Sequence, residues 1–439
     1  MIKIHIIQKL FYVKRLKKRF YNWSRTKLEK HQQNRLRKII SFTRRNSSYY
    51  KQLFPSEQPV SISDIPIMNK KTMMDNFNQI VTAELDRDSL IEYFLNQEKT
   101  GDYSKYQGKY SVGLSSGTSG NKSLTILSKK ESDLYNCLLY ARNGIPKNVQ
   151  QKRILFALRR YNPTFMEVSS FGIHLVYIDY TLTGKEMVDL INSKNLNVLA
   201  GPPSLLEIIA RLYDEINHKI DAIISYAEVL SDFAKNKLED IFKAPVVQIY
   251  QGSEGFIAST CKNGNLHLNE DVLFFEFEKL ENHFGLAKNI ILTDLYRTTQ
   301  PILRYQMDDI LEMSSEPCEC GSCFQVIEKI QGRKDDVFHL KNNEGEIRFL
   351  FPDYIRRAIN QASDQILEYQ AIQKSPELIE IRLILSDKSD RIKIIKTIMN
   401  NLKSWAKKLG ANLGVVEFSD REPEKNPVSK KLIRVQRRF

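Results

Sequence analysis

Residues 113–123 read GLSSGTSGNKS, a run of small and polar residues between two apolar stretches. Glycine lets the backbone approach a ligand closely and adopt positive φ values. Successive backbone N–H groups can then form a concave anion site, to which Ser and Thr hydroxyls add donors. The run therefore suits a phosphate-binding loop, although Gly/Ser runs are also typical of plain surface turns.

Two known motifs do not fit this loop. The P-loop requires Gly-x4-Gly-Lys-Ser/Thr, and the spacing from Gly117 to Lys122 is too short for it. Ser119 and Lys122 match the Ser-x-x-Lys of penicillin-binding enzymes. In that family, however, the Lys-Thr-Gly follows, whereas here it comes earlier, at 99–101, and no Ser-Asp-Asn is present.

Outward from the loop, strand and helix patterns alternate from residue 111 to about 250. Such alternation predicts an α/β fold with a parallel or mixed sheet and crossover helices. Residues 265–312 are rich in strand patterns and predict a β subdomain, and beyond 333 the pattern resets to a small α+β unit. We therefore divide the chain into an N-terminal helical segment at 1–53, a large domain at 54–332 and a small domain at 333–439.

Composition narrows the class of protein. A chain of 439 residues with 42% apolar residues is globular and too long for one core. No apolar run reaches the roughly 18–20 residues that span a bilayer, and no signal peptide is evident. Five cysteines do not make a disulfide scaffold, so we expect a cytoplasmic protein. The sequence gives no indication of the oligomeric state.

The positive charge is concentrated at the N-terminus. Residues 1–53 hold 16 Lys and Arg against one acid, Glu29, which gives +15 and leaves −1 of the net +14 for the rest. A body so close to neutral argues against a nucleic-acid enzyme. The first 23 residues interleave Lys and Arg with Ile, Leu, Phe and Tyr. They predict either an amphipathic helix on the inner, anionic membrane face or a helix packed on the body by its apolar side.

Four further motifs follow the loop in a fixed order. They are SYAEVL at 225–230, IYQGSEGFIA at 249–258, LRYQMDDIL at 303–311 and GRKDD at 332–336. Together with the loop they resemble the adenylate-forming superfamily of acyl-CoA ligases. Within it the chain looks like the phenylacetate–CoA ligase branch and its capsule-locus relatives. The resemblance implies a large ATP- and acid-binding domain at 54–332 and a mobile C-terminal domain at 333–439.

The resemblance also implies a role for each matched residue. The loop Ser115, Ser116, Gly117, Thr118, Ser119 and Gly120 would hold the β- and γ-phosphates of ATP. The adenine and α-phosphate would meet Ala227, Glu228, Tyr250, Gly252 and Ser253. Asp309 would bind the ribose, Arg333 the ribose or phosphate, and Glu254 a Mg²⁺ ion that offsets phosphate charge. Asp335 would be the hinge of the C-terminal domain. Each residue taken alone could instead be a cap, a turn former or a surface ion-pair partner.

Several positions depart from the family pattern. Lys122 comes one residue early and without the usual Pro, and Ser253 replaces a Thr. In the tail NPVSKKLIRVQRR, Lys431 aligns with the family's catalytic Lys, while Lys430 replaces a flexible Gly. Lys431 would stabilise the carboxylate and bridging oxygen, although Lys/Arg-rich tails are usually only solvated.

Four of the five cysteines lie in one window of the sequence. Cys261 and His267 are followed by Cys318 and Cys320, with Cys323 nearby. Three thiolates and an imidazole form a closed tetrahedral zinc site, and clustering in a cytoplasmic protein favours a metal over a disulfide. We choose Cys320 over Cys323 as the fourth ligand, because a Cys-x-Cys-Gly turn brings both thiolates to one side. The alternative is a buried Cys261 beside an ordinary turn.

These observations predict ATP-dependent activation of a small-molecule carboxylic acid to an acyl-adenylate, followed by transfer to the thiol of coenzyme A. Transfer to a carrier protein or an amine is the alternative within this class. An inactive homologue that acts as a membrane-associated scaffold in polysaccharide or lipid assembly is the alternative outside it. The acid pocket is expected to be apolar and partly aromatic, from residues within 158–180 and 224–256.

Overall fold

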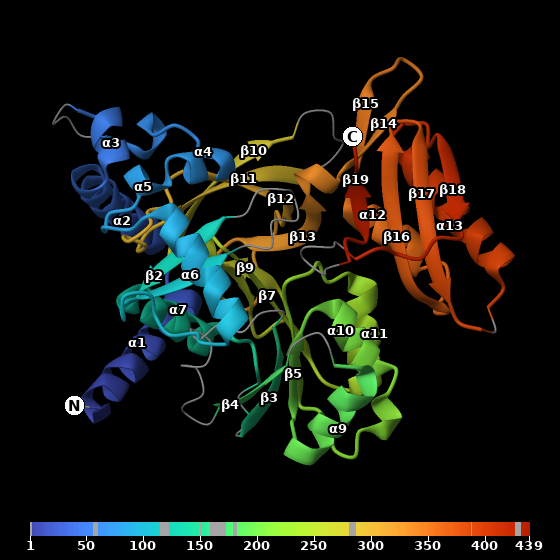
Figure 1. The fold of residues 1–439 in the computed structure, drawn as a ribbon, viewed down its shortest axis with the longest axis horizontal. Coiled ribbons are helices and arrows are strands. Elements are labelled where there is room, and N and C mark those ends of the chain that lie inside the picture. Colours follow the sequence, from blue (N-terminus) through green and yellow to red (C-terminus); the bar gives the residue numbers. More distant parts are fainter. Residues whose placement is uncertain are drawn as a thin grey trace.

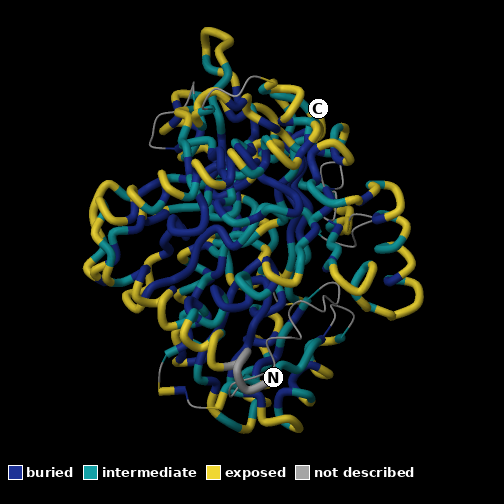
Figure 2. The backbone as a smooth tube through the Cα atoms, turned by 90° about the vertical axis from the view of Figure 1, so that its left-hand side faces the viewer, coloured by how far each residue is buried: buried dark blue, intermediate teal, exposed yellow. Residues whose placement is uncertain are grey.

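The computed structural model describes residues 2–55, 60–114, 123–146, 148–149, 151–158, 173–178, 182–280, 287–387, 389–425 and 432–439, with side chains from residue 7 onward. These residues form a large α/β body and, from β14 (Phe338–Lys341) onward, a small α+β body beside it (Figure 1). Each body has its own hydrophobic core. Buried segments run through the interior while exposed segments lie at the periphery (Figure 2).

Helices form the N-terminal part of the chain. They are α1 (Ile2–Asn22), α2 (Arg25–Asn46), α3 (Ser48–Leu53), α4 (Lys70–Asp75), α5 (Phe77–Ile80) and α6 (Arg87–Thr100). The second half of α1 packs on the body, where Leu16 and Phe20 are fully buried. On its first half, Ile7, Leu10 and Phe11 are exposed.

The loop that opened the sequence analysis joins the two strands of a hairpin. β1 (Tyr110–Leu114) and β2 (Leu124–Ser128) pair antiparallel, with Leu114 opposite Leu124. They form a separate two-stranded sheet and do not join the main one. The helix α7 (Lys129–Arg142) follows at once, because Ser128 and Glu131 form a capping box at its start.

One eleven-stranded sheet organises the large body. Its order is β10-β11-β12-β13-β9-β8-β7-β6-β5-β3-β4. The strands are β3 (Lys152–Ala157), β4 (Ile173–Ile178), β5 (Val198–Gly201), β6 (Ala222–Ser225), β7 (Val246–Gly252), β8 (Gly255–Thr260), β9 (Leu266–Leu268), β10 (Leu273–Lys279), β11 (Ala287–Asp294), β12 (Tyr305–Met313) and β13 (Val326–Arg333). The strands from β3 to β7 are parallel, and those from β7 to β13 pair antiparallel.

The parallel half of the main sheet, β3 to β7, has the alternating strands and crossover helices that the sequence predicts. β5 and β6 are buried at every residue, as expected for strands covered on both faces. The crossover helices are α9 (Gly184–Lys194), α10 (Pro203–Ala210) and α11 (Asp232–Phe242). Thr183 and Glu186 cap α9, and Pro203 stands in the first turn of α10, where its missing N–H costs nothing. α10 is shorter than its apolar pattern suggests, and a 3-10 turn at Tyr213–Glu215 follows it.

The small body is a four-stranded sheet with two helices. Its sheet order is β18-β17-β16-β19, with β14 and β15 (Ile347–Leu350) as a separate hairpin. The remaining elements are α12 (Pro352–Asn360), β16 (Ile366–Ser375), β17 (Leu378–Leu385), α13 (Arg391–Lys408), β18 (Val415–Ser419) and β19 (Val435–Arg437). The α/β fold class predicted from the sequence is confirmed. Among the described helices, none is both long and apolar enough to cross a bilayer.

Candidate active site

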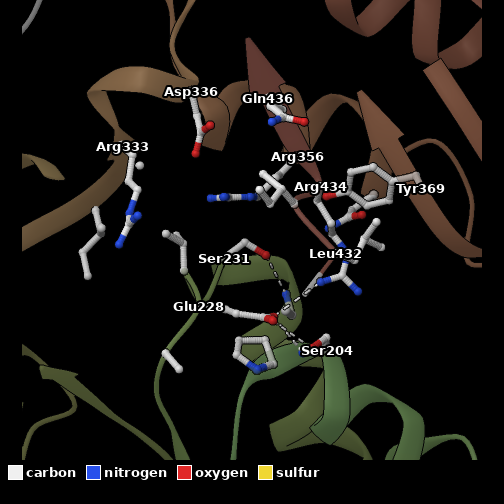
Figure 3. A pocket seen from close by; sticks show the side chains of 18 of the residues that line it. Ser204, Glu228, Ser231, Arg333, Asp336, Arg356, Tyr369, Leu432, Arg434 and Gln436 are labelled. Carbon is white, nitrogen blue, oxygen red and sulfur yellow. Dashed lines mark hydrogen bonds and ion pairs between the residues drawn. The ribbon is translucent and has the colours of Figure 1, made fainter. Parts of the chain in front are cut away.

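A cavity of about 660 Å³ lies between the two bodies. The large body contributes residues that include Glu228, Tyr250, Asp309 and Arg333, and the small body contributes Tyr369. In Figure 3, Glu228 and Arg333 of the large body and Tyr369 and Arg434 of the small body lie around the same gap. We call this cavity the interdomain cleft.

Three predicted nucleotide contacts meet in the cleft. The Tyr250 hydroxyl donates to Asp309 Oδ2 at 2.7 Å, and Arg333 Nε lies 3.9 Å from Asp309 Oδ1. Asp309 and Arg333 face each other as paired residues of β12 and β13. Tyr250 comes from β7, and three strands lie between β7 and β12 in the sheet. Burial and the neighbouring Asp309 carboxylate raise the pKa of Tyr250, so its hydroxyl stays protonated and donates.

Glu254 lies in the tight turn between β7 and β8. Gly252 pairs with Gly255 across this turn, and a Cβ atom on Gly252 would collide with the Glu254 carboxylate. A larger residue at 252 would therefore force the Glu254 side chain out of its present position. Burial raises the pKa of Glu254, with Asp309 adding to the rise and Arg333 opposing it.

Ser253 connects the turn to the phosphate-loop hairpin. Its Oγ lies 3.5 Å from the Oγ of Ser123, the first described residue after the loop. Its carbonyl oxygen accepts from Arg297 Nη1 at 2.8 Å, and Arg297 is itself buried. Residues 115–120, together with Asn121 and Lys122, lie outside the described residues. Their C-terminal flank nevertheless stands beside the turn that carries Ser253 and Glu254.

Glu228 holds the two bodies together at one edge of the cleft. It accepts from Ser204 Oγ at 3.1 Å and pairs with Arg434 Nη1 at 3.4 Å (Figure 3). Arg434 also lies over the Tyr369 ring, with its guanidinium carbon 5.8 Å from the centroid. Ala227, the residue before Glu228, has a φ of +66°, an unusual value for a residue with a side chain. Glu228 therefore both lines the cleft and forms an ion pair with the small body.

The remaining predictions divide into those inside and those outside the described chain. Asp335 lines the cleft from the 3-10 turn Lys334–Asp336, between the last strand of the large body and the first of the small one. Lys431 lies outside the described residues, and Arg434, three residues later, is in the cleft.

Sequence reasoning missed several cleft residues. Arg356 and Tyr369 line the cleft from the small body, and Gln251 lies beside Tyr250. Lys70 does not line the cleft, but it interacts electrostatically with Arg333, which does, and with Asp308, and burial lowers the pKa of Lys70. Gln251 sits inside a quoted motif and could have been found there. Lys70 precedes the first motif by more than forty residues, and nothing in its neighbourhood marks it.

An apolar pocket of about 70 Å³ adjoins the cleft. It shares Ile249 and Gln251 with the cleft and is otherwise lined mainly by side chains such as Leu139, Phe156 and Ile224. None of its described lining residues is charged. Four of its lining residues come from the segment 224–256 and two, Ile173 and Leu175, from the segment 158–180, the two segments expected to form the acid pocket. Of the second segment, 159–172 and 179–180 lie outside the described residues.

Polar atoms around this pocket are mostly occupied. The Tyr226 hydroxyl donates to Ala157 O and Ala200 O at 2.5 and 3.0 Å. Asn143 Oδ1 accepts from Ile145 N at 3.0 Å. Gln251 Oε1 accepts from the Tyr135 hydroxyl, which orients the amide and leaves its NH₂ group as a donor at the junction with the cleft.

The four predicted zinc ligands lie together in the large body. One ligand atom each from Cys261, His267, Cys318 and Cys320 falls within 4.8 Å of all the others. Cys261 Sγ is 3.8 Å from Cys318 Sγ, and Cys320 Sγ is 3.5 Å from His267 Nε2. Cys323 is not in this group, which agrees with the choice of Cys320.

The chemistry of this cluster suits a metal ion. His267 Nδ1 lies 2.8 Å from Phe324 O, so Nδ1 carries the proton and Nε2 presents a lone pair to the thiols. Burial lowers the pKa of His267, which keeps the ring neutral, and raises the pKa of the Cys320 thiol to about 12. Burial also raises the pKa of Cys261, whereas hydrogen bonds, first of all from Asn265, lower the pKa of the less buried Cys318. The two buried thiols would need a cation to become thiolates, and a bound zinc ion would supply it.

No model of a known protein family matches the chain. The protein CapK of Staphylococcus aureus is 24% identical over 388 residues, covering 85% of this chain and 82% of CapK. The indoleacetate–lysine synthetase of Pseudomonas savastanoi is 25% identical over 344 residues, covering 73% of this chain and 82% of that enzyme.

Solved structures of 2-hydroxyisobutyryl-CoA ligase share the fold. The post-adenylation state with its acyl-adenylate matches with a TM-score of 0.69 at 14% identity, covering 92% of this chain and 88% of the ligase. The thioesterification state of the same ligase matches with a TM-score of 0.57, covering 96% and 91%. The resemblance to the adenylate-forming ligases predicted from the sequence is thereby confirmed at the level of fold.

Proposed function

We propose that this chain, which has the fold of the adenylate-forming acyl-CoA ligases, activates a carboxylic acid with ATP and transfers the acyl group to coenzyme A. One observation carries the proposal. Tyr250, Asp309 and Arg333, from three separate motifs, converge on one cleft, and Glu254, beside the flank of the phosphate loop, interacts electrostatically with Asp309 and Arg333.

The first half-reaction is a displacement at the α-phosphorus of ATP. A carboxylate oxygen forms the new bond, and pyrophosphate leaves with the bridging oxygen. Asp309 would accept from the ribose hydroxyls, Arg333 would contact ribose or phosphate, and Tyr250 would line the adenine. The loop 115–120 would hold the β- and γ-phosphates, and Ser253 the α-phosphate.

Glu254 is the residue we assign to Mg²⁺. It lies in the turn after the proposed adenine strand, its carboxylate interacts electrostatically with Asp309 and Arg333 of the cleft, and Mg²⁺ prefers such oxygen ligands. When bound, the ion would offset negative charge on the phosphates. Lys431 would stabilise the attacking carboxylate, and Asp335 would be the pivot of the small body. The higher similarity to the post-adenylation state than to the thioesterification state supports a domain arrangement suited to this first step.

The acid in this proposal is an apolar monocarboxylate. The described walls of the adjoining pocket carry no charge, so a second carboxylate or an ammonium group would be buried there without a partner. The Gln251 amide NH₂ is a donor at the pocket mouth, and it would favour an acid with an acceptor near its carboxyl end.

The acceptor could instead be an amine. The indoleacetate–lysine synthetase relative supports this second candidate by its name, which describes transfer to an amino acid. Transfer to a carrier protein is the third possibility. Incubation of the acyl-adenylate with coenzyme A, lysine or hydroxylamine, followed by mass spectrometry of the product, distinguishes the acceptors.

A structural zinc ion is part of the proposal. Cys261, His267, Cys318 and Cys320 would hold it in a closed tetrahedral site without a free position for substrate. Its role would be to tie the β8–β9 turn to the loop at 318–320 and to stabilise the large body. Metal analysis of protein purified without an affinity tag tests this assignment.

We also propose a peripheral contact between α1 and an anionic membrane. The buried Leu16 and Phe20 show that the second half of α1 is core, so packing explains that half of the helix. On the first half, Ile7 and Phe11 are 64% and 70% exposed, next to exposed basic residues further along the helix. Apolar side chains beside lysines match the chemistry of an anionic lipid surface.

The deciding experiment is ATP–pyrophosphate exchange with a panel of acids. Exchange with aliphatic or aromatic monocarboxylates, but not with dicarboxylates or amino acids, is expected. Exchange only with charged acids would contradict the assigned acid class and leave the adenylation proposal standing. No exchange with any acid would favour the scaffold alternative.

A further inference from the structure

A second groove, of about 440 Å³, is lined mainly by residues of α1 and α2. These two helices lie on the side of the large body that is away from the small body (Figure 1). Its basic lining consists of Arg15, Arg19, Arg35 and Lys38. Tyr296, from the turn after β11, closes its floor together with His31. None of its lining residues lines the interdomain cleft, so it is a separate site.

The two inner arginines are held in place by the body. Arg35 donates to Leu295 O through Nε and Nη2, and its guanidinium lies 3.8 Å from the Tyr296 ring centroid. Arg19 is 4% exposed, donates to the Tyr296 hydroxyl at 3.3 Å and lies 3.6 Å from Asp271. Its buried Nε–H has no partner among the described residues. Thus the groove has rigid cationic walls with donor capacity to spare.

The two outer cations are free. Arg15 and Lys38 are exposed, and neither has a hydrogen bond or ion pair with any residue that the structure describes. Among the acids that the structure describes, the one that forms an ion pair with a groove residue is Asp271, which is fully buried and also paired with Arg142 at 2.8 Å. One carboxylate shared by two arginines cannot neutralise four cations, so the groove carries a surplus of positive charge.

This surplus indicates the class of ligand. A carboxylate would compensate one of the uncompensated cations, whereas a phosphomonoester carries up to two negative charges and three acceptor oxygens. Arginine forks match phosphate geometry, and the hydroxyl group of Tyr12 stands beside them as a further possible donor. We propose that the groove between α1 and α2 binds a terminal phosphate group, on a soluble metabolite or on a lipid headgroup.

The test uses one probe for each source of phosphate. Inositol trisphosphate, followed by calorimetry, represents a soluble phosphomonoester. Vesicles of phosphatidic acid in phosphatidylcholine, followed by sedimentation, represent a lipid headgroup. The groove variant is Arg15→Glu/Lys38→Glu, and the matched control is Lys30→Glu/Lys51→Glu, which changes the charge of exposed lysines outside the groove by the same amount.

We expect full-length protein to bind at least one probe. The groove variant should lose at least about tenfold in affinity and the control less than about twofold, since the contacts are local and charge-assisted. Binding of the trisphosphate alone assigns a soluble ligand, and binding of vesicles alone assigns a lipid. Both variants should keep the thermal midpoint of the wild type, because the substituted side chains are exposed.

Two results would overturn the proposal. One is absence of binding to both probes at low salt, where attraction between exposed charges is strongest. The other is an equal loss of binding in the groove variant and the control, which would show a diffuse basic surface in place of a site. Neither result depends on whether the chain adenylates an acid.

Discussion

The Cys/His cluster and the interdomain cleft are both built from ligand-type side chains, but they are constructed in opposite ways. The cluster draws its four side chains from one body, three of them buried, with ligand atoms within 4.8 Å of one another. The cleft draws its side chains from two bodies around about 660 Å³, through contacts as long as 3.4 and 3.9 Å. A closed site suits stability, whereas an open and adjustable one suits substrates that enter and leave.

The largest effect in this comparison of the cluster and the cleft is expected when the charge of Glu254 is removed. Glu254→Gln should lower ATP–pyrophosphate exchange about 10³-fold, roughly 4 kcal/mol, because a metal-binding charge would be lost from the transition state. The thermal midpoint should not fall, since burial already raises the pKa of this carboxyl and disfavours its ionised form. Exchange and melting are measured on the same preparation.

The control for this variant is Glu278→Gln on β10, an exposed carboxylate away from the cleft. It should leave both exchange and melting unchanged. If Glu254→Gln exchanges at the wild-type rate with an accepted acid, Glu254 is not the metal-binding residue and the site is misassigned.

Substitution in the Cys/His cluster should have the opposite effect, lowering stability more than activity. Cys261→Ser is expected to lower the free energy of unfolding by about 3 kcal/mol, because loss of a metal site is among the largest single-residue effects. Turnover per folded molecule should change less than twofold, as the cluster has no position for substrate. Denaturant unfolding with metal analysis checks the first expectation, and exchange normalised to folded protein checks the second.

Cys323→Ser is the matched control, because Cys323 lies in the same loop and outside the group of four. It should retain one zinc ion and nearly the wild-type stability. Equal destabilisation by the two serine variants would argue for ordinary packing of cysteines and against a metal.

The difference between the two sites also explains how far each could be predicted from the sequence. The cluster comes from segments with their own signals: Cys261 directly follows β8, His267 lies in β9, the next strand, and Cys318 and Cys320 flank one residue. The parallel strands and crossover helices could also be predicted from the sequence, because β5 and β6 are largely apolar runs and α9 and α11 begin at clear N-cap residues.

The residues that meet in the cleft were harder to predict from the sequence. Tyr250 and Asp309 meet although three strands separate β7 from β12, and the strand order that curls the sheet has no local signature. The Arg434–Glu228 pair depends on how the two bodies are placed relative to each other, and local sequence patterns do not predict that placement. Motif resemblance supplied Tyr250, Asp309 and Glu228, and it could not supply Lys70 or Tyr369, which belong to no quoted motif.

A smaller effect is expected from the contact that joins the two bodies at the cleft. Arg434→Met removes the ion pair with Glu228, and we expect pyrophosphate exchange to fall about tenfold, or 1.4 kcal/mol. Acyl transfer from a supplied acyl-adenylate should change less, if that step uses a different placement of the small body. Arg438→Met, in the exposed end of the chain, is the control. Equal loss in both half-reactions would show that Arg434 does not act through the placement of the bodies.

The smallest effect should come from the outer ion pair between the bodies. Lys237 Nζ lies 3.0 Å from Asp364 Oδ1, and the two side chains are 38% and 76% exposed. Such exposed pairs contribute about 0.2–1 kcal/mol and are screened by salt. Lys237→Glu should therefore reduce exchange no more than about fivefold at low salt, and the reduction should shrink at high salt. The double exchange Lys237→Glu/Asp364→Lys should restore most of the loss, because it rebuilds the pair with reversed polarity. A loss that the double exchange does not restore would mean that Lys237 acts through its own contacts with α11, such as its position over the Phe233 ring, and not across the boundary between the bodies.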